Sequence, residues 1–186
     1  IFKKIIKRFE KDTSVEAKKW AKLNTKYTTE DFCKSIDMLL YDEVKTDVGL
    51  IKKEAIEKLS KLNISFGGGG NYFLLYFLIR KFKLLNIVET GVAAGWSSLA
   101  ILRALKKNGN GHLYSSDFPY FRLEDPEKYI GYLAQDESNK NDWILDIRGD
   151  DVALPQIKNQ IGNKSIDLFH YDSDKSYSGR ANALKT

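Results

Sequence analysis

The sequence predicts an α/β fold: a Rossmann-like, mostly parallel sheet with helices on both faces, preceded by an N-terminal helical segment. Three observations lead to this prediction. Residues 1–66 show helical periodicity, whereas residues 67–186 alternate short apolar runs with helical stretches. Glycine and asparagine turn signals separate these runs. Strand–helix alternation is typical of parallel sheets with right-handed crossovers, so we place a boundary between residues 66 and 67.

The composition indicates a folded protein without covalent or metal staples. Of the 186 residues, 42% are hydrophobic and 30% charged, which excludes a disordered chain. A single cysteine, Cys33, excludes an intramolecular disulfide framework and a cysteine-based zinc site. No apolar run approaches the roughly 18 residues of a membrane-spanning helix. We therefore expect a cytoplasmic protein with no membrane span.

The excess positive charge is confined to the beginning of the chain. The formal net charge is +5, and residues 1–34 carry ten Lys/Arg against five Asp/Glu, whereas the remainder is balanced. A nucleic-acid binder more often carries basic charge on the domain that recognises the ligand, so no nucleic-acid partner is expected. The pattern favours a solvated helix face, with contact to a membrane surface or an acidic partner as the alternative.

Three amphipathic stretches predict the N-terminal helices. Apolar residues recur at helical spacing from Ile1 to Phe9. Thr28 and Asp31 offer a helix cap before the apolar positions of residues 32–40, and a third apolar face runs from Ile51 to Leu62.

A glycine run then interrupts the helical pattern. Gly67–Gly70 cannot continue a helix without a large entropic cost, and Asn71 follows as the cap of an apolar helix over residues 72–82. The glycine run is interpreted as a plain connector, with a flexible lip over a ligand pocket as the alternative.

The remaining elements alternate. Four short apolar runs predict strands over residues 86–90, 112–116, 143–147 and 166–171. Three stretches between them predict helices over residues 96–107, 124–133 and 153–161. In such sheets ligands bind at the carboxyl ends of the strands.

The segment from Val88 to Ser98 is the strongest functional signal, because it begins on a strand and ends in a helix. Gly91 allows the sharp turn, and small residues after it let a ligand approach the backbone. Ser97 lies near the helix N-terminus, where free N–H groups favour an anion. Asp117 ends the second strand, and its carboxylate can accept both hydroxyls of a ribose.

The glycine spacing excludes two common nucleotide sites. Gly91-x-x-x-Gly95 does not match the dinucleotide fingerprint, and no Gly-Lys-Ser/Thr of a Walker loop follows. The acidic Glu89 would repel a pyrophosphate and suits a ligand that carries an ammonium group.

Three segments, over residues 89–97, 147–157 and 166–177, resemble the motifs of class I S-adenosylmethionine-dependent methyltransferases, in the expected order. They are most similar to the catechol and caffeoyl-CoA O-methyltransferase group. The resemblance covers about residues 67–180. The sheet of that class normally has seven strands, so the C-terminal strands are expected to be missing from these residues.

The resemblance implies a cofactor role for the matched residues of the first motif. Glu89 and the backbone of Gly91 and Val92 would face the methionine part of S-adenosylmethionine. Gly95 would allow close backbone approach, and Ser97 would hold the cofactor carboxylate.

Further cofactor contacts are implied on the later strands. Asp117 would bind the ribose hydroxyls, and Asp174 would help to hold the ammonium group. Asp150 would lie beside the adenine, with Asp151 as a substitute or a plain helix cap as the alternative.

The same resemblance implies that Lys175 and Asp172 are catalytic residues. Lys175 would be the general base toward a substrate hydroxyl, and Asp172 would be a ligand of Mg²⁺. The alternatives are a surface lysine and a metal-free cofactor or structural contact.

The predicted function is transfer of a methyl group from S-adenosylmethionine to a hydroxyl of a small molecule or sugar, with Mg²⁺ assistance as an option. The alternatives are a nucleotide-binding oxidoreductase and a non-enzymatic module on a degenerate methyltransferase fold. The expected partner is a small-molecule acceptor, and a homodimer is left open.

Overall fold

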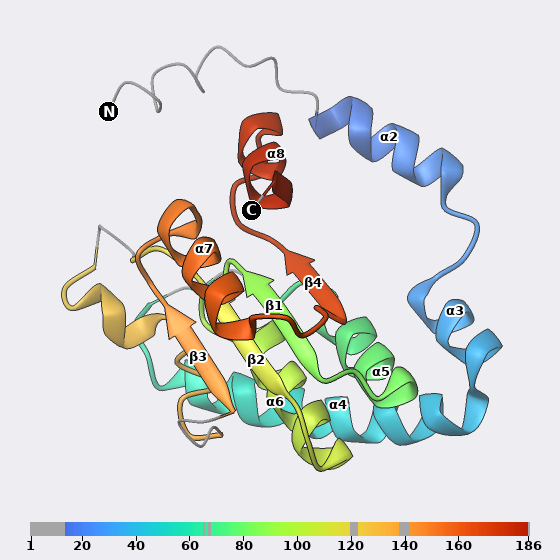
Figure 1. Cartoon of the computed structure of the whole chain (residues 1–186). Coiled ribbons are helices and arrows are strands. Elements are labelled where there is room, and N and C mark those ends of the chain that lie inside the picture. Colours follow the sequence, from blue (N-terminus) through green and yellow to red (C-terminus); the bar gives the residue numbers. More distant parts are fainter. Residues whose placement is uncertain (1–13, 65, 67, 120–122, 138–141, 186) are drawn as a thin grey trace.

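The computed structural model describes residues 14–64, 66, 68–119, 123–137 and 142–185, and its centre is a parallel sheet (Figure 1). The sheet has the strand order β3-β2-β1-β4. The strands are β1 (Asn86–Thr90), β2 (His112–Ser116), β3 (Trp143–Asp146) and β4 (Leu168–Tyr171). All pairs are parallel, so the carboxyl ends of all four strands lie at one edge. The predicted Rossmann-like sheet is confirmed.

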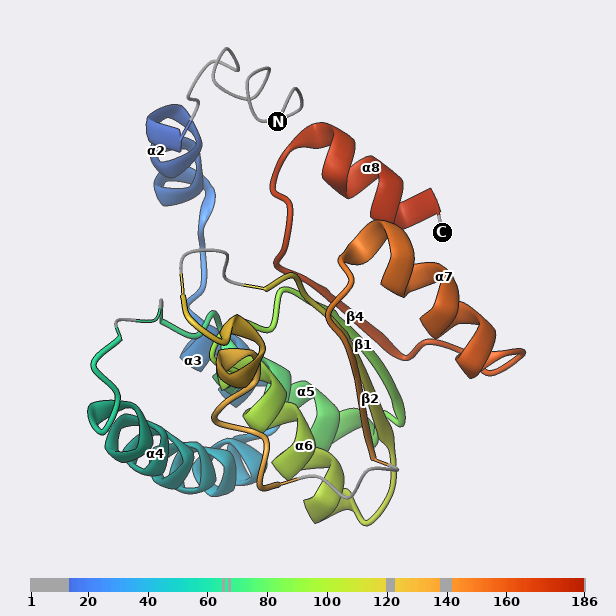
Figure 2. The same ribbon diagram turned by 90° about the vertical axis from the view of Figure 1, so that its left-hand side faces the viewer.

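Helices cover both faces of this sheet, as Figure 2 shows edge-on. One face carries α5 (Tyr72–Phe82) and α6 (Trp96–Asn108), with α4 (Met38–Ser60) packed outside them. The other face carries α7 (Asp150–Ile161) and α8 (Tyr177–Lys185). The N-terminal helices α2 (Ser14–Asn24) and α3 (Thr29–Ile36) precede them. None of the described helices combines the length and the apolar character needed to cross a bilayer.

Strand alternation divides the core into two layers. Ile87 packs with α6 residues such as Leu99, and this layer extends to Val44 of α4. The next strand residue, Val88, faces the opposite side and packs with Leu154 of α7. Burying each of these side chains contributes about 1.5–3 kcal/mol. Two apolar layers on a short sheet therefore hold the strand ends in fixed positions.

Side-chain caps determine where the N-terminal helices begin. Thr28 Oγ1 accepts a hydrogen bond from the Asp31 N–H at 3.0 Å, and Asp31 accepts one from the Thr28 N–H at 3.1 Å, which confirms the expected cap. The apolar positions of residues 32–40 divide between α3 and α4 because Asp37 starts a new helix. Its Oδ1 accepts from the Leu40 N–H at 3.0 Å.

The glycine run ends at a capped helix, as expected. Asn71 Oδ1 accepts from the Leu74 N–H at 3.2 Å, and α5 ends at Lys83 in a left-handed conformation. The four strands and the helices α6 and α7 differ from their predicted bounds by at most three residues. The apolar face expected from Ile51 to Leu62 is the second half of α4, which begins at Met38, and helices α2 and α8 were not predicted. The helix expected from Ile1 to Phe9 lies outside the described residues.

The helix predicted over residues 124–133 is wrong. Only a 3-10 turn, η2 (Pro126–Tyr129), forms there, and residues 130–137 follow as turns. Two backbone N–H groups that a helix would use internally are bonded elsewhere: Gly131 N–H donates to Ala93 O at 2.8 Å and Leu133 N–H to Ala94 O at 2.9 Å. Contacts to the turn after β1 therefore replace the local helix.

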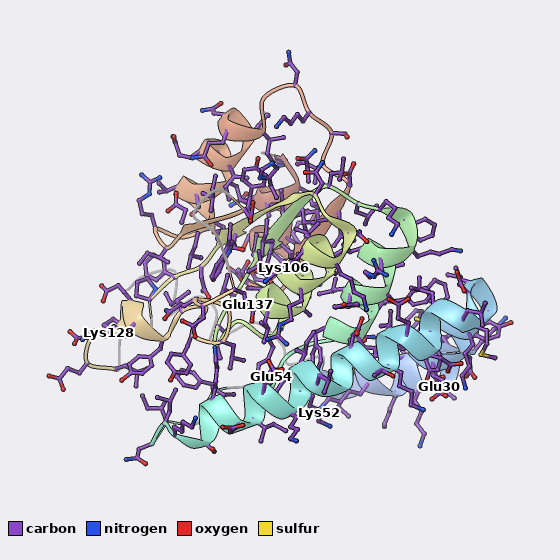
Figure 3. The ribbon with its side chains drawn as sticks, turned by 90° about the horizontal axis from the view of Figure 1, so that it is seen from below. Glu30, Lys52, Glu54, Lys106, Lys128 and Glu137 are labelled. Atoms are coloured by element: carbon purple, nitrogen blue, oxygen red, sulfur yellow. The ribbon has the colours of Figure 1, made fainter. Side chains whose placement is uncertain are left out.

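Charged side chains attach α4 to this turn segment. Arg103 of α6 bridges Glu54 of α4, at 2.5 Å, and Glu137, at 2.7 Å. Figure 3 shows Glu54 and Glu137 on the same side of the molecule as Lys106 of α6. The cluster contributes to the attachment of α4, although exposed ion pairs are each worth only about 0–1 kcal/mol.

Candidate cofactor and acceptor site

The turn after β1 is shaped by Gly91, which has φ +80°. Its N–H donates to Ser116 O of the neighbouring strand at 2.8 Å. A Cβ atom at this position would lie 2.6 Å from the backbone oxygen of Asp172, in the loop after β4. Because only glycine tolerates both the conformation and the close approach, Gly91 brings that loop directly against the turn.

Ala93 is the exposed tip of the turn and is held on both sides. Its N–H donates to Asp117 Oδ2 at 2.6 Å, and its carbonyl accepts from Gly131 N–H at 2.8 Å. Ala93 has φ +50°, a left-handed conformation that costs an L-residue with a side chain about 1–2 kcal/mol. Gly95 follows at φ +91°, and its Cα region packs against Gly131. The turn is therefore fixed before any ligand arrives.

Asp117 stands at the carboxyl end of β2 with both oxygens directed at backbone. Oδ2 accepts from Ala93 N–H, and Oδ1 accepts from Phe118 N–H at 2.6 Å. Burial raises the pKa of Asp117, and the backbone N–H donors of Phe118 and Ala93 act in the opposite direction. Each carboxylate oxygen has a further lone pair, so Asp117 can still accept hydroxyl groups.

Glu89 lies beneath the turn and is fully buried. Its Oε2 accepts hydrogen bonds from Ser98 at 2.6 Å and Ser115 at 2.9 Å, and Ser115 in turn accepts from the Trp143 indole N–H at 2.9 Å. Oε1 has no hydrogen-bond partner among the described residues. Burial raises the pKa of Glu89, and the serine hydroxyls around it act to lower it. Its direct contact with a cofactor stays a prediction.

Ser97 is buried in the first turn of α6, beside this network. The N-terminal N–H groups of α6 follow Gly95, which offers no side-chain cap. Free N–H groups at a helix start favour an anionic group such as a carboxylate. The placement of Ser97 agrees with its predicted neighbourhood, while its contact with the cofactor carboxylate is untested.

The loop after β4 brings a lysine and two carboxylates to the same edge. Lys175 Nζ lies 2.6 Å from Asp172 Oδ1, and the lysine side chain is 66% exposed. Asp174 Oδ1 accepts from the Ser176 N–H at 2.9 Å. The sequence-predicted pair Lys175 and Asp172 is therefore brought together, as an ion pair.

Asp150 ties α7 to two strand ends. Its carboxylate accepts hydrogen bonds from Ser116 Oγ at 2.6 Å and from Ser173 Oγ. It is the first residue of α7, where a carboxylate also interacts favourably with the helix dipole. Its predicted position beside an adenine remains a prediction.

Comparison with protein families matches the chain to a family described as a methyltransferase domain, over residues 88–186. The match begins inside β1 and includes the turn, Asp117, Asp150 and the loop after β4. The chain belongs to this methyltransferase family. No curated protein matches the chain at the significance required. Membership implies S-adenosylmethionine as the methyl donor; the catechol and caffeoyl-CoA subgroup is not confirmed.

The chemistry of the edge fits this cofactor. Four carboxylates gather at the carboxyl ends of the strands, and they complement a ligand with a sulfonium and an ammonium charge: Asp117, Asp150, Asp172 and Asp174. The start of α6, which has no side-chain cap, supplies the complementary N–H groups. The methyltransferase therefore offers both kinds of group that a charged amino-acid nucleoside requires.

The fit for Mg²⁺ is poor in the part of the chain that the structure describes. No group of three or more His, Cys, Asp or Glu side chains there is arranged to hold a metal ion. Asp172, the predicted ligand, is paired with Lys175. We therefore derive no step through a metal.

No motif in the sequence indicates the clamp that residues 130–134 form on the turn, through the N–H groups of Gly131 and Leu133. A Cβ atom on Gly131 would lie 2.4 Å from the Trp143 ring, and one on Gly95 would lie 2.9 Å from the Gly131 Cα. Trp143 thus packs against Gly131, and Gly131 in turn packs against Gly95 of the turn. The only signal in the sequence was Gly131 inside an expected helix.

The glycine run borders the site. A Cβ atom on Gly69 would lie 2.3 Å from Trp96 Cβ, and one on Gly70 would lie 4.0 Å from Asp172 Oδ2. Trp96 also stacks on Tyr72, with ring centroids 5.3 Å apart. Gly69 and Gly70, which precede α5, therefore form one wall beside the Asp172–Lys175 pair.

A separate groove of about 470 Å³ lies between α4 and the C-terminal half of α6, away from the carboxyl edge. Its charged lining pairs internally: Arg103 with Glu54 and Glu137, and Lys107 with Asp47. The groove therefore offers mostly paired charges, and we assign it no ligand.

Proposed function

We propose that this methyltransferase transfers a methyl group to a hydroxyl of a small molecule or a sugar. The observation that carries the proposal is the Lys175–Asp172 pair, because it lies on the loop that packs against Gly91 of the turn. A basic amine beside the methyl-donor site suits an acceptor that must lose a proton. S-adenosylmethionine, when bound, supplies a methyl group already activated on a sulfonium.

The cofactor contacts belong to the same proposal. Asp117 accepts the ribose hydroxyls through the lone pairs that Ala93 and Phe118 leave free. Ser97 and the start of α6 hold the cofactor carboxylate. Because the turn is already fixed by hydrogen bonds, binding does not have to order it, which reduces the entropic cost.

In the acceptor reaction Lys175, whose side chain is 66% exposed, first releases its ammonium proton to solvent, and the neutral Nζ then accepts the proton of the hydroxyl group. Asp172 orients the amine and stabilises the ammonium that forms, because its Oδ1 lies 2.6 Å away. Gly69 and Trp96 form a wall that limits how the acceptor approaches.

The test compares Lys175→Met with Lys164→Met, a matched control at an exposed lysine between α7 and β4. A panel of phenols and sugars serves as acceptors, and S-adenosylhomocysteine release is measured. We expect kcat to fall by about 10²- to 10⁴-fold in Lys175→Met, with cofactor affinity nearly unchanged. Lys164→Met should match the unmodified protein.

Equal losses of turnover and cofactor affinity would make Lys175 a structural residue. Transfer to amines or thiols alone, with none to hydroxyls, would refute the acceptor class while leaving the methyltransferase family intact.

A further inference from the structure

Helix α2 stands apart from the folded body. Figures 1 and 2 both show it projecting beyond the sheet and its covering helices. Every residue from 15 to 28 is exposed, including Trp20 at 68% and Leu23 at 85%. The segment over residues 14–27 is called the arm below.

A helix of this length needs a surface to rest on. Isolated helices shorter than about 12–15 residues are marginal in water, and α2 has 11 residues. Nothing in the described residues covers the apolar side chains of the arm. An exposed tryptophan and leucine on a helix without tertiary contacts indicate a partner outside the folded body.

The charge of the arm, together with that of the residues before it, indicates what that partner is. Residues 14–27 carry four lysines and one glutamate. Residues 1–27 carry nine Lys/Arg and three Asp/Glu, whereas residues 28–186 carry 21 and 22. The entire positive excess of the protein therefore precedes residue 28. A partner of negative charge is complementary to this segment and not to the rest of the chain.

The helical spacing separates two kinds of side chain. Lys18, Lys19 and Lys22 share one side of α2, since residues three and four apart are neighbours on a helix. Trp20 and Leu23 lie three residues apart on the adjoining side, where Leu23 is one turn from Lys19. Basic residues on one side and a tryptophan with an aliphatic residue on another are typical of helices that lie in a membrane interface.

We propose that the arm docks on the surface of an anionic lipid bilayer. Trp20 and Leu23 enter the headgroup region, while the lysines contact anionic lipid headgroups and extend to water. Figures 1 and 2 place α2 on the side of the sheet towards which the strands point, so docking turns the carboxyl edge towards the bilayer. The docking itself does not depend on the proposed acceptor chemistry.

The test uses the full chain without cofactor or acceptor. Co-sedimentation is measured with vesicles of phosphatidylcholine alone and with vesicles that also contain phosphatidylserine. We expect binding to the phosphatidylserine vesicles, loss of that binding at high salt, and a blue shift of tryptophan emission that Trp20→Phe reduces.

Two triple variants with equal net charge distinguish an effect of the arm lysines from an effect of the protein's overall charge. Lys18→Gln/Lys19→Gln/Lys22→Gln should weaken vesicle partitioning on the order of 100-fold, because each lysine near an anionic surface contributes about 1 kcal/mol, roughly a factor of five. The control changes three exposed lysines outside the arm: Lys52, labelled in Figure 3, Lys53 and Lys164. It should bind as the unmodified protein does.

Several results would overturn the proposal. One is no binding to phosphatidylserine vesicles, and another is an equal loss of binding in both triple variants. Self-association through the arm, detected by light scattering and abolished by Trp20→Ala without any vesicle binding, would assign the surface to a second copy instead. Melting temperatures should be unchanged in all arm variants, since α2 packs against no core residue.

Discussion

Substituting Gly131 with alanine tests the clamp that residues 130–134 form on the turn after β1. Gly131 has φ +68°, and a Cβ atom there would lie 2.4 Å from Cη2 of the Trp143 ring. The ring cannot swing away freely because Trp143 is buried and its N–H is bonded to Ser115 Oγ at 2.9 Å. The substitution therefore forces either the indole or the backbone that holds Ala93 to move.

The expected magnitude has two contributions. A left-handed conformation costs alanine about 1–2 kcal/mol, and overpacking a buried site costs about 1–3 kcal/mol more. Gly109→Ala is the matched control, since Gly109 has φ +85° and nothing within 4 Å of an added Cβ. The control carries the conformational cost alone. Gly131→Ala should thus be the more destabilising by about 1–3 kcal/mol.

Urea unfolding measures this difference, and calorimetry with S-adenosylhomocysteine measures its effect on the site. We expect Gly131→Ala to weaken ligand binding, because its N–H positions the Ala93 carbonyl at 2.8 Å, and Gly109→Ala to leave affinity unchanged. If the two variants are equally stable and bind equally well, the clamp has no role in holding the turn.

Three further perturbations address the same edge. Ala93→Gly should raise the free energy of unfolding, measured in urea, by about 0.5 kcal/mol. The relief of left-handed backbone strain in the folded state slightly exceeds the cost of the extra conformational entropy of the unfolded chain. A loss of stability would show that Ala93 is not strained. Glu89→Gln should flatten the pH dependence of stability. Burial raises the folded-state pKa of Glu89 above its ordinary 4.5. The protonated Glu89 therefore contributes to the free energy of unfolding below pH 4.5, and this contribution is lost as pH rises through the folded-state pKa. Parallel curves of stability against pH for the two proteins would disprove this. Gly69→Ala should displace Trp96 and so lower both ligand affinity and the melting temperature. Gly68→Ala is the control, because an added Cβ there meets open space, and it should change neither quantity. Identical behaviour of the two variants would show that Gly69 and Trp96 do not contribute to the site.

Much of the fold was predictable because its signals are local. β1 and β2 match their expected bounds, since each is an apolar run between turn-forming residues. The start of α5 followed from the Asn71 cap. The error over residues 124–133 has a non-local cause: the N–H groups of Gly131 and Leu133 bond to a turn some 40 residues earlier in the chain. No local pattern carries that information.

The residues that meet at the candidate site could be predicted once the order of the strands was predicted. Consecutive parallel strands end at one edge, so Gly91, Asp117 and Asp172 had to approach one another once the strands were identified. Two features were out of reach. The burial of Glu89 depends on Ser98 and Ser115 from two other elements, and the Lys175–Asp172 ion pair depends on side-chain placement within a loop.

The most direct measurement of the central claim is calorimetric titration of the full chain with S-adenosylhomocysteine, using Asp117→Asn as the variant and Asp136→Asn, at an exposed remote carboxylate, as the control. We predict binding by the unmodified protein and by the control. Asp117→Asn should bind about 10- to 100-fold more weakly, because hydrogen bonds to a charged group contribute about 1.5–3 kcal/mol. No binding by the unmodified protein, or undiminished affinity in Asp117→Asn, would contradict the account.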